Sequence, residues 1–358
     1  MTGGHSLPTF FARTNAAKKI IVVDLGFLGD AVHLIPALWE IKRHYPEAAL
    51  HVLTSAVGAE VLSLAPCVDR AWIFPLGPKS PPWWRHWNII RELRREHFDL
   101  ALNFSGADRT IFLTALTGAK WRAMRAGRRR HFWSRWLIQD HAPLENTEWP
   151  VYEQRRSVLE ALGFPPLQPA RFDLRLPADA IARAEKSIPP GAIHLSINAS
   201  TPLKEWPLAR WIELGKQLLR ENNSLSLVAS GSRREREQAR LRGWAEGISD
   251  VRGRLLPVDA TIADLAAALQ RCRLHIGNDS GVLHLAAALG VPTFSIFRDY
   301  PGLKEWLPPG EKHRHVLAPC PCAERSDPPC LVSGEAACLA SISAETAARE
   351  VRVQLESI

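Results

Sequence analysis

An alternation of short apolar strands with amphipathic helices constrains the fold of this chain more than any other feature of its sequence. Residues 19–23 (KIIVV) form a β-branched apolar run, and in the segment that follows, Leu34, Leu38 and Ile41 recur at helical spacings of four and three. Residues 49–55 (ALHVLTS) then have the pattern of a second strand. Because two parallel strands need a long crossover connection, usually a helix, this pattern predicts a parallel βαβ unit.

The alternation stops in the middle of the chain and then starts again. Residues 163–190 contain six prolines and few apolar runs, which is typical of a linker, and strands and helices alternate once more from Ala192. We therefore predict an α/β protein with two Rossmann-like, doubly wound domains that face each other across a cleft and bind ligands beyond the carboxyl ends of their strands. The expected segments are an N-terminal domain over 1–170, a linker over 171–190, a C-terminal domain over 191–340 and a C-terminal helix at the domain seam over 341–358.

Composition and charge exclude several classes of protein. Of the 358 residues, 46% are apolar and 23% are charged, as in ordinary globular proteins. No apolar run approaches the ~18–20 residues that cross a bilayer, which argues against a membrane-spanning protein. The first residues lack a signal-peptide pattern, and six cysteines are too few for a disulfide scaffold, which argues against a secreted protein. We therefore expect a cytoplasmic protein. Residues 1–150 carry 19 Lys and Arg against 13 Asp and Glu, which predicts an anionic partner for the first half: a phosphorylated substrate, a membrane face or nucleic acid.

The loop after the first strand, residues 24–30 (DLGFLGD), carries two carboxylates and two glycines. It lacks the G-x-G-x-x-G pattern of dinucleotide-binding loops. Asp30 stands where the next helix should begin, so it is either a helix cap or, at the carboxyl end of a strand, a general base. Asp24 ends the strand and is either a structural carboxylate or a ligand contact.

Residues 276–292 (IGNDSGVLHLAAALGVP) predict a strand, a sharp turn, a helix rich in small residues and another strand. Ser280 and Gly281 place free backbone N–H groups at the start of this helix, an arrangement that binds phosphate. His284 lies one turn further along the same face and could reach the same ligand. The alternative is that Asp279 and Ser280 only cap the helix and that His284 packs inside the domain.

Two further loops follow strands of the second half. In residues 198–207 (NASTPLKEWP), the hydroxyls of Ser200 and Thr201 and the ammonium of Lys204 are candidates for binding a diphosphate, and Lys204 would neutralise a diphosphate leaving group. A single lysine on a loop is otherwise simply solvated. Glu235 is placed to accept hydrogen bonds from ribose hydroxyls, although glutamate is common in the first turn of any helix.

Three patterns in this order resemble the heptosyltransferases of bacterial lipopolysaccharide assembly (glycosyltransferase family 9): the G-D pair followed by a P-A-L helix, then K-x-W-P-x-x-x-W, then N-D-S-G-x-x-H-L-A-A-A-L-G-x-P. The resemblance runs from about Ile20 to the C-terminus and implies the GT-B fold, with the acceptor on the N-terminal domain and an ADP-sugar on the C-terminal domain. It implies inverting transfer of a sugar, most simply heptose from ADP-heptose, onto a lipopolysaccharide-core or related cell-envelope glycan, without a metal or other cofactor.

The resemblance also implies roles for individual residues. Asp30 would be the general base and Lys204 would assist departure of the diphosphate. The donor would be bound by Ser200, Thr201, Lys204, Glu235, Asp279, Ser280, Gly281 and His284. Two features differ from the family pattern: Asp24 stands where members often have Lys or Arg, and Gly26-Phe27 replaces a serine-containing pair. The alternatives are another nucleotide sugar, a protein acceptor, a nucleotide-sugar epimerase and a protein that binds a nucleotide sugar without catalysis.

Residues 121–136 (WRAMRAGRRRHFWSRW) contain six arginines, three tryptophans and no acid. We expect this segment to contact a phosphorylated glycolipid acceptor or the anionic inner face of the inner membrane, and we assign acceptor binding to Gly29, Arg122, Arg125 and Arg128. A solvated basic loop and nucleic-acid binding are the alternatives, and since no nucleic-acid module accompanies the segment we expect no such partner. Trp83, Trp84 and Trp87 beside Arg85 form a second aromatic and basic segment.

Four cysteines gather late in the chain, at Cys320, Cys322, Cys330 and Cys338. Four thiolates can hold zinc or iron, but C-x-C is tighter than the spacing that usually opens a zinc site, so we expect reduced thiols and no metal. Cys67 and Cys272 are expected to be small buried apolar residues.

Overall fold

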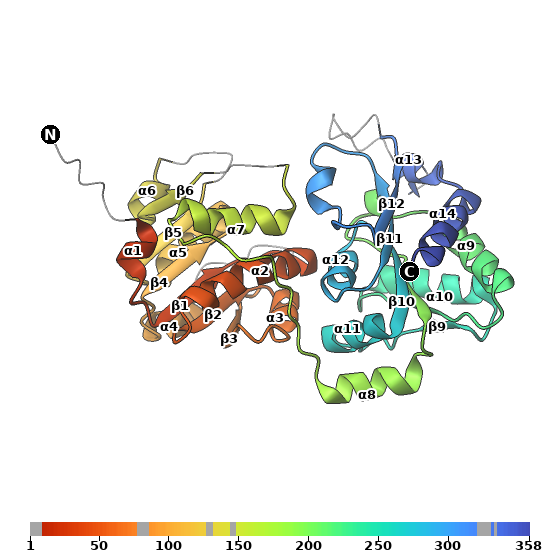
Figure 1. The fold of residues 1–358 in the computed structure, drawn as a ribbon, viewed down its shortest axis with the longest axis horizontal. Helices are drawn as coiled ribbons and strands as arrows, with labels where there is room; N and C mark the ends of the chain where they lie inside the picture. Colours follow the sequence, from red (N-terminus) through yellow and green to blue (C-terminus); the bar gives the residue numbers. More distant parts are fainter. Residues whose placement is uncertain (1–8, 77–85, 127–131, 144–147, 321–330, 333–334) are drawn as a thin grey trace. The chain divides into compact units, whose positions relative to one another are not determined.

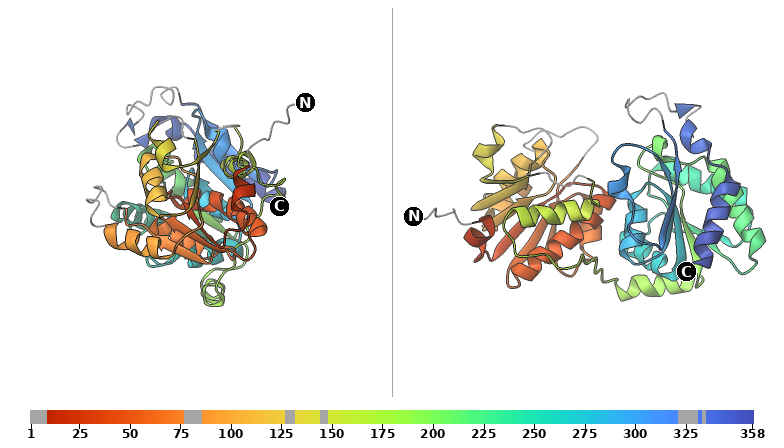
Figure 2. Two further views of the ribbon diagram at one scale, coloured as in Figure 1. Left: turned by 90° about the vertical axis from the view of Figure 1, so that its left-hand side faces the viewer. Right: turned by 45° about the horizontal axis from the view of Figure 1, so that its top comes forward.

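The computed structural model consists of two units, Met1–Leu174 and Arg175–Ile358. The described residues are 9–76, 86–126, 132–143, 148–320, 331–332 and 335–358. Each unit is built on one parallel sheet with helices on both faces (Figures 1 and 2), as the alternation in the sequence predicts.

The sheet of the first unit has six strands in the order β3-β2-β1-β4-β5-β6, all parallel. Its strands are β1 (Lys19–Val23), β2 (Ala49–Thr54), β3 (Arg70–Ile73), β4 (Leu100–Asn103), β5 (Trp121–Arg125) and β6 (Asp140–Ala142). The order reverses between β1 and β4, and ligands of doubly wound sheets bind at such a switch point.

Helices connect these strands and bury the two faces of the sheet. They are α1 (Phe10–Thr14), α2 (Leu28–His44), α3 (Ala56–Leu62), α4 (Trp87–Arg95), α5 (Asp108–Leu116), α6 (Ser134–Leu137) and α7 (Val151–Ala161). One face packs Ile21 and Val23 against Leu93 of α4 and Leu113 of α5. Helix α2 packs against α3 and α7, and its predicted apolar residues are fully buried.

The second sheet repeats the same topology. Its order, β12-β11-β10-β7-β8-β9, is again parallel and reverses between β7 and β10. Its strands are β7 (Ala192–Ser196), β8 (Leu227–Ala229), β9 (Gly253–Leu255), β10 (Cys272–Asn278), β11 (Thr293–Arg298) and β12 (His313–Ala318). A short antiparallel pair, β13 (Leu331–Val332) and β14 (Glu335–Ala336), precedes the C-terminal helices.

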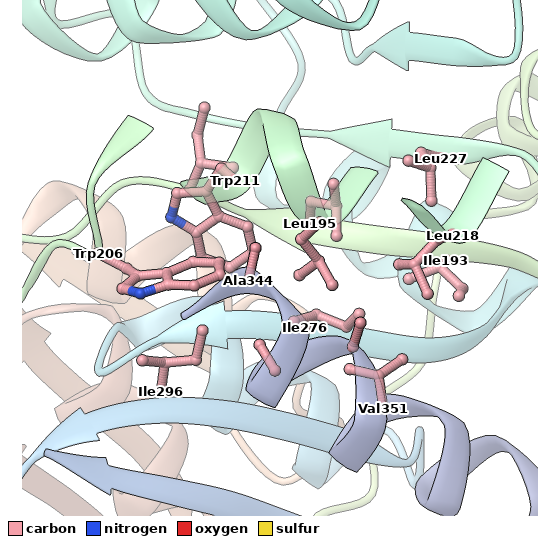
Figure 3. Close-up of a cluster of buried hydrophobic side chains, with 14 of the residues drawn as sticks. Ile193, Leu195, Trp206, Trp211, Leu218, Leu227, Ile276, Ile296, Ala344 and Val351 are labelled. Carbon is pink, nitrogen blue, oxygen red and sulfur yellow. The ribbon is translucent and has the colours of Figure 1, made fainter. Parts of the chain in front are cut away.

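The helices of the second unit enclose its sheet from two sides. They are α8 (Ala178–Ser187), α9 (Leu208–Glu221), α10 (Glu235–Ile248), α11 (Ile262–Arg271), α12 (Gly281–Ala288), α13 (Ala337–Ala340) and α14 (Ala344–Glu356), with 3₁₀ turns η2 (Pro202–Lys204) and η3 (Leu303–Trp306). Figure 3 shows the larger core, in which Trp206 and Trp211 lie beside Ala344, and Val351 of α14 lies at the other end of the cluster. Helix α14 is therefore part of the core of this unit.

Two segments differ from the sequence-based expectation. Residues 178–187, placed in a linker, form α8, because Ala180 and Ala184 lie one turn apart and pack against α11. The prolines that suggested a linker instead flank this helix: Pro177 is its N-cap, and Pro189 follows its end. Residues 121–125, read as part of a basic surface segment, form β5, in which Ala123 and Met124 are buried.

No helix among the described residues is long and apolar enough to cross a bilayer.

Candidate functional site

The first group of predicted residues lies at the carboxyl edge of the first sheet, where β1 leads into α2. Asp24 is buried directly after β1, and one of its carboxylate oxygens accepts a hydrogen bond from the Gly26 N–H at 2.9 Å. Burial raises the pKa of Asp24, and the nearby Arg155 guanidinium opposes that rise. Asp24 is thus a buried carboxylate that needs its cationic partner.

Asp30 lies in the first turn of α2, which begins two residues earlier than the sequence indicates, at Leu28. Its Oδ2 accepts a hydrogen bond from the Phe27 N–H at 2.9 Å, so the capping role weighed for this residue is present. Its side chain nevertheless remains 29% exposed, which lets a substrate hydroxyl reach the carboxylate. The loop can approach Asp30 closely because position 26 is glycine: a Cβ there would lie 2.2 Å from the Asp30 Cβ.

Arg155, on α7, is a site residue that the sequence analysis missed. Its Nη2 lies 3.1 Å from Asp24 Oδ2 and 3.2 Å from Asp30 Oδ1, and its Nη1 donates to the Asp30 carbonyl oxygen at 2.5 Å. The three residues come from β1, α2 and α7, and Arg155 is 125 residues from Asp30 in the chain. No local motif could have identified it; only the packing of α7 on α2 brings it to this edge.

The predicted acceptor residues have different surroundings. Gly29 is buried in the first turn of α2. Arg125 ends β5 and, like Arg155, lies close enough to Asp24 to oppose the rise that burial causes in the pKa of that carboxyl. Arg122 donates to the carbonyl oxygens of Leu137 and Ala119, both at 2.6 Å, so in this structure its guanidinium holds the surrounding loops instead of pointing to a ligand. Arg128 lies outside the described residues.

In the second unit, three loops meet at the carboxyl edge near the switch point. Lys204, from the loop after β7, places its Nζ 2.7 Å from Oδ2 of Asp279, which follows β10. The Tyr300 hydroxyl, after β11, donates to the same oxygen at 3.1 Å. Burial together with Asp279 raises the pKa of Tyr300, which keeps its hydroxyl protonated. Tyr300 was missed in the sequence, although its place just after a strand could have indicated it.

The start of α12 lies beside this contact. Ser280 is the N-cap residue, but its side chain makes no capping hydrogen bond, and its hydroxyl lies 3.4 Å from that of Ser196. Gly281 is the first residue of the helix. His284 is buried, with its ring 5.5 Å from that of Trp306, as the packing alternative for this residue expects. The helix start offers backbone N–H groups to an anion.

The K-E-W-P motif holds the Lys204 loop in place. The buried Glu205 accepts hydrogen bonds from the Ala199 N–H at 2.9 Å and from Arg236 at 2.6 Å. Trp206 is fully buried, and its indole N–H donates to the Ile342 carbonyl at 3.0 Å. Ser200 and Thr201, between these anchors, are exposed and can therefore meet a ligand.

Glu235, predicted to bind a ribose, begins α10 with its side chain 84% exposed and paired with Arg242 at 2.6 Å. Two residues later, Glu237 is buried and accepts a hydrogen bond from the Ser232 N–H at 2.8 Å. Glu237 is therefore the carboxylate that shapes the loop after β8.

A buried histidine pair lies on the two central strands of the second unit. His194 and His275 face each other in register, with their Nδ1 atoms 2.9 Å apart, and His194 Nε2 lies 3.0 Å from the Ser230 hydroxyl. Burial lowers the pKa of His194 to about 3 and that of His275 well below its ordinary value. Both imidazoles are therefore neutral in the folded protein near pH 7.

Two of the four late cysteines fall in the described residues. Cys320 is buried, Cys338 is half-buried, and neither forms a disulfide. Burial and a hydrogen bond with Cys320 raise the pKa of Cys338. Cys322 and Cys330 lie outside the described residues. In the part of the chain that the structure describes, no three His, Cys, Asp or Glu side chains are grouped as a metal site.

Part of the basic and aromatic segment forms an exposed surface on α5 and α6. Trp136 and Phe132 are 79% and 76% exposed, and Phe112 and Leu116 of α5 are also exposed. Trp133 stacks on Phe112 with ring centroids 4.9 Å apart. We call Phe112, Leu116, Phe132 and Trp136 the α5–α6 aromatic surface. Trp87 is 47% exposed on α4, whereas Trp83, Trp84 and Arg85 lie outside the described residues.

Comparison with known proteins shows what this chain resembles. The model of "Glycosyltransferase family 9 (heptosyltransferase)" matches residues 86–333. A curated relative, lipopolysaccharide heptosyltransferase 1 of Pseudomonas aeruginosa, is 29% identical over 330 residues, which cover 87% of this chain and 86% of the relative.

Two solved structures share the fold over nearly the whole chain. A glycosyl transferase family 9 structure from Veillonella parvula has a TM-score of 0.81 at 18% identity and covers 99% of both chains. The structure of ADP-heptose lps heptosyltransferase II from E. coli has a TM-score of 0.75 at 20% identity and covers 95% of this chain and 99% of that one. The predicted fold class is confirmed.

Proposed function

The chain belongs to glycosyltransferase family 9, the heptosyltransferase family, and from this premise we propose that it transfers heptose from ADP-heptose to a lipopolysaccharide-core acceptor with inversion at the anomeric carbon. The relatives it matches are named lipopolysaccharide heptosyltransferases, and one structure that shares its fold is named for ADP-heptose. Membership also makes the chain a glycosyltransferase, so the epimerase and the non-catalytic binding protein are not favoured.

The observation that carries the donor assignment is the contact between Lys204 and Asp279 beside the start of α12. It joins two motifs 75 positions apart into one site with a cation, exposed hydroxyls and helix N–H groups. We propose that Lys204, Ser280 and Gly281 bind the diphosphate, with His284, Ser200 and Thr201 around it. Asp279 would accept hydrogen bonds from the sugar, and Glu235 would bind the ribose.

We propose that Asp30 is the general base of the first unit. Its carboxylate would take the proton from an acceptor hydroxyl while that oxygen forms a bond to the anomeric carbon from the side opposite the diphosphate. The bond between the anomeric carbon and the diphosphate oxygen breaks with its electron pair, and ADP leaves. Lys204 and the N–H groups of α12 would stabilise the charge that develops on ADP. Among the predicted acceptor residues, Arg125 has the position best suited to a phosphorylated acceptor.

The test is transfer itself. The enzyme would be incubated with ADP-heptose or with UDP-, GDP- or CMP-sugars, each with and without a heptose-free lipopolysaccharide core. The masses of the products would be measured by mass spectrometry. A heptose mass added to the core only in the presence of ADP-heptose is the expected result. A changed free sugar without acceptor would indicate an epimerase, and transfer from another nucleotide sugar would replace the donor.

We further propose that the enzyme works at the cytoplasmic face of the inner membrane, with the α5–α6 aromatic surface in contact with the lipid. Tryptophan is favoured at membrane interfaces, and arginines surround this surface in the sequence. Co-sedimentation with vesicles that contain anionic lipid should fall in Trp136→Ser, whereas Trp149→Ser, at a tryptophan that is 44% exposed, is the control. Equal binding by both variants and the parent would exclude this surface.

A further inference from the structure

We infer that Arg155, held in place by Asp24, positions Asp30 for proton transfer and places a compensating positive charge beside its carboxylate; the inference rests on the proposed role of Asp30. Arg155 belongs to no motif of the sequence, and its position on α7 is known only from the packing of that helix on α2.

The geometry restrains Asp30 at three points. Arg155 bonds the main-chain carbonyl and the Oδ1 atom of Asp30, while the Phe27 N–H bonds Oδ2. Donors from α7 and from the loop before α2 therefore approach the carboxylate from two sides. A carboxylate has about four lone-pair positions, so both oxygens retain capacity for a substrate proton.

Asp24 in turn holds the arginine. Its Oδ2 lies 3.1 Å from Nη2, the same nitrogen that lies 3.2 Å from Asp30, and the side chains of Asp24 and Arg155 are 4% and 6% exposed. One guanidinium nitrogen is thus shared between a buried carboxylate and a partly exposed one. Since the buried partner is shielded from water, it anchors the cation while the exposed partner meets the substrate.

The charges around Asp30 come from several elements. Asp24 lies at the end of β1, Arg125 at the end of β5 and Arg155 on α7, and His33 follows Asp30 by one turn on α2. Two carboxylates therefore compete for Arg155, with Arg125 as the next cation. Loss of Arg155 would remove the positive charge beside Asp30, and loss of the Asp24 charge would leave the guanidinium to Asp30 alone.

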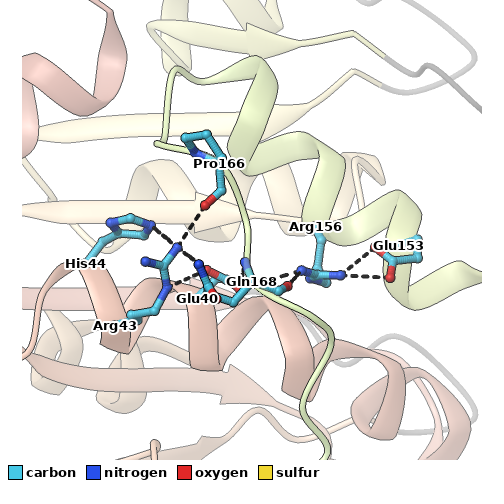
Figure 4. A network of polar contacts seen from close by, with 7 residues as sticks. All are labelled: Glu40, Arg43, His44, Glu153, Arg156, Pro166 and Gln168. Carbon is cyan, nitrogen blue, oxygen red and sulfur yellow. Dashed lines mark hydrogen bonds and ion pairs between the residues drawn. The ribbon is translucent and has the colours of Figure 1, made fainter.

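Arg156, the next residue on α7, provides a matched control because it is equally buried but faces another network (Figure 4). It forms two hydrogen bonds of 2.7 Å with Glu153, donates to the Gln168 carbonyl, and lies 3.5 Å from Glu40 of α2. Its loss would weaken the packing of α7 and the following segment without touching Asp30. A purely structural role for Arg155 would make the two arginines equivalent.

The first experiment compares pH–rate profiles. In Arg155→Met we expect kcat to fall by about 100-fold with little change in the KM for the donor, and the acidic limb of the profile to move up by about one pH unit. Arg155→Lys should recover part of the rate and the parental limb. In Asp24→Asn the acidic limb of the pH–rate profile should move to lower pH. Arg156→Met should keep the parental profile per folded molecule; the same shift in both arginine variants would overturn the inference.

A second measurement does not depend on activity. In protein labelled with ¹³C at the aspartate carboxyls, Asp30→Asn identifies the Asp30 resonance, and its titration is followed in each variant. The titration midpoint should rise in Arg155→Met and stay at its parental value in Arg156→Met. The double variant Asp24→Asn/Arg155→Met leaves no unpaired buried carboxylate, so it covers the case in which Arg155→Met does not fold. Its midpoint should lie above that of Asp24→Asn alone, because the two variants differ only in the Arg155 charge. Equal midpoints in these two variants would overturn the inference, whereas a wild-type enzyme that transfers no sugar would contradict only the proposed function.

Discussion

The two units have the same strand order, but the charged residues at the carboxyl edges of their sheets differ. In the first unit, two carboxylates surround one arginine after β1; in the second, one lysine, one aspartate and a helix start lie between β7 and β10. The first arrangement suits proton removal and the second suits anion binding. The fold sets where the chemistry takes place, and the residues at the strand ends decide which chemistry it is.

The largest expected effect separates the two edges. Asp30→Asn removes the proposed base and leaves the residues of the second unit unchanged, so kcat should fall by about 10²–10⁴-fold while the dissociation constant for ADP stays unchanged. Steady-state kinetics and calorimetric titration with ADP would measure the two quantities. Turnover at the parental rate would contradict the base assignment.

The complementary change affects the second edge. Lys204→Ala removes the cation beside Asp279, so the affinity for ADP should fall by about 10- to 100-fold, as expected for loss of a charge-assisted hydrogen bond. Lys216→Ala, an exposed lysine on α9, is the control. If ADP binds both variants equally, the diphosphate does not lie at Lys204.

Replacing one glycine in each unit by alanine tests how the two units differ in their tolerance of an added Cβ, measured as a change in the free energy of unfolding. In Gly26→Ala the new Cβ would lie 2.2 Å from the Asp30 Cβ, and we expect a loss of about 1–3 kcal/mol in the free energy of unfolding together with lower activity. In Gly243→Ala, within α10, the nearest atom is the end of the Leu208 side chain at 3.2 Å, and helix propensity favours alanine. Urea unfolding would measure the free energy of unfolding of both variants. Equal values for Gly26→Ala and Gly243→Ala would show that the loop before Asp30 can move to make room for the new Cβ.

The last prediction concerns the stability of the second unit at acid pH, where the effect per pH unit is small. The pKa of His194 falls from 6.5 to about 3 on burial, so below pH 6.5 the unfolded chain binds a proton that the folded chain does not. The free energy of unfolding should therefore fall with decreasing pH, by about 1.4 kcal/mol per pH unit for this histidine. His194→Gln should remove that part of the slope in urea unfolding between pH 7.5 and 4.5, whereas His97→Asn, an exposed histidine of the first unit, should not. A parental slope in His194→Gln would refute the assignment.

The same comparison explains how far the sequence could predict this molecule. Strands and helices with a clear apolar periodicity, such as β1, α2 and β10, were predicted, because that periodicity is a local property. Others, among them α5, α7 and β6, were not. In β5 and α8, arginines and neighbouring prolines outweigh a short apolar pattern. The proximity of Lys204 to Asp279 was predicted, since both belong to recognisable motifs. The partner of Asp30 was not, because Arg155 comes from a helix that only tertiary packing brings to this edge.

The hydrogen bond from the Trp206 indole to the Ile342 carbonyl links the Lys204 loop to the segment before α14. Trp206 stands two residues after Lys204, and Ile342 stands just before α14, whose alanines and Val351 fill the same core. A nonsense mutation shortly before codon 343 would thus leave every proposed catalytic and donor-binding residue in the product and still remove the support of the lysine.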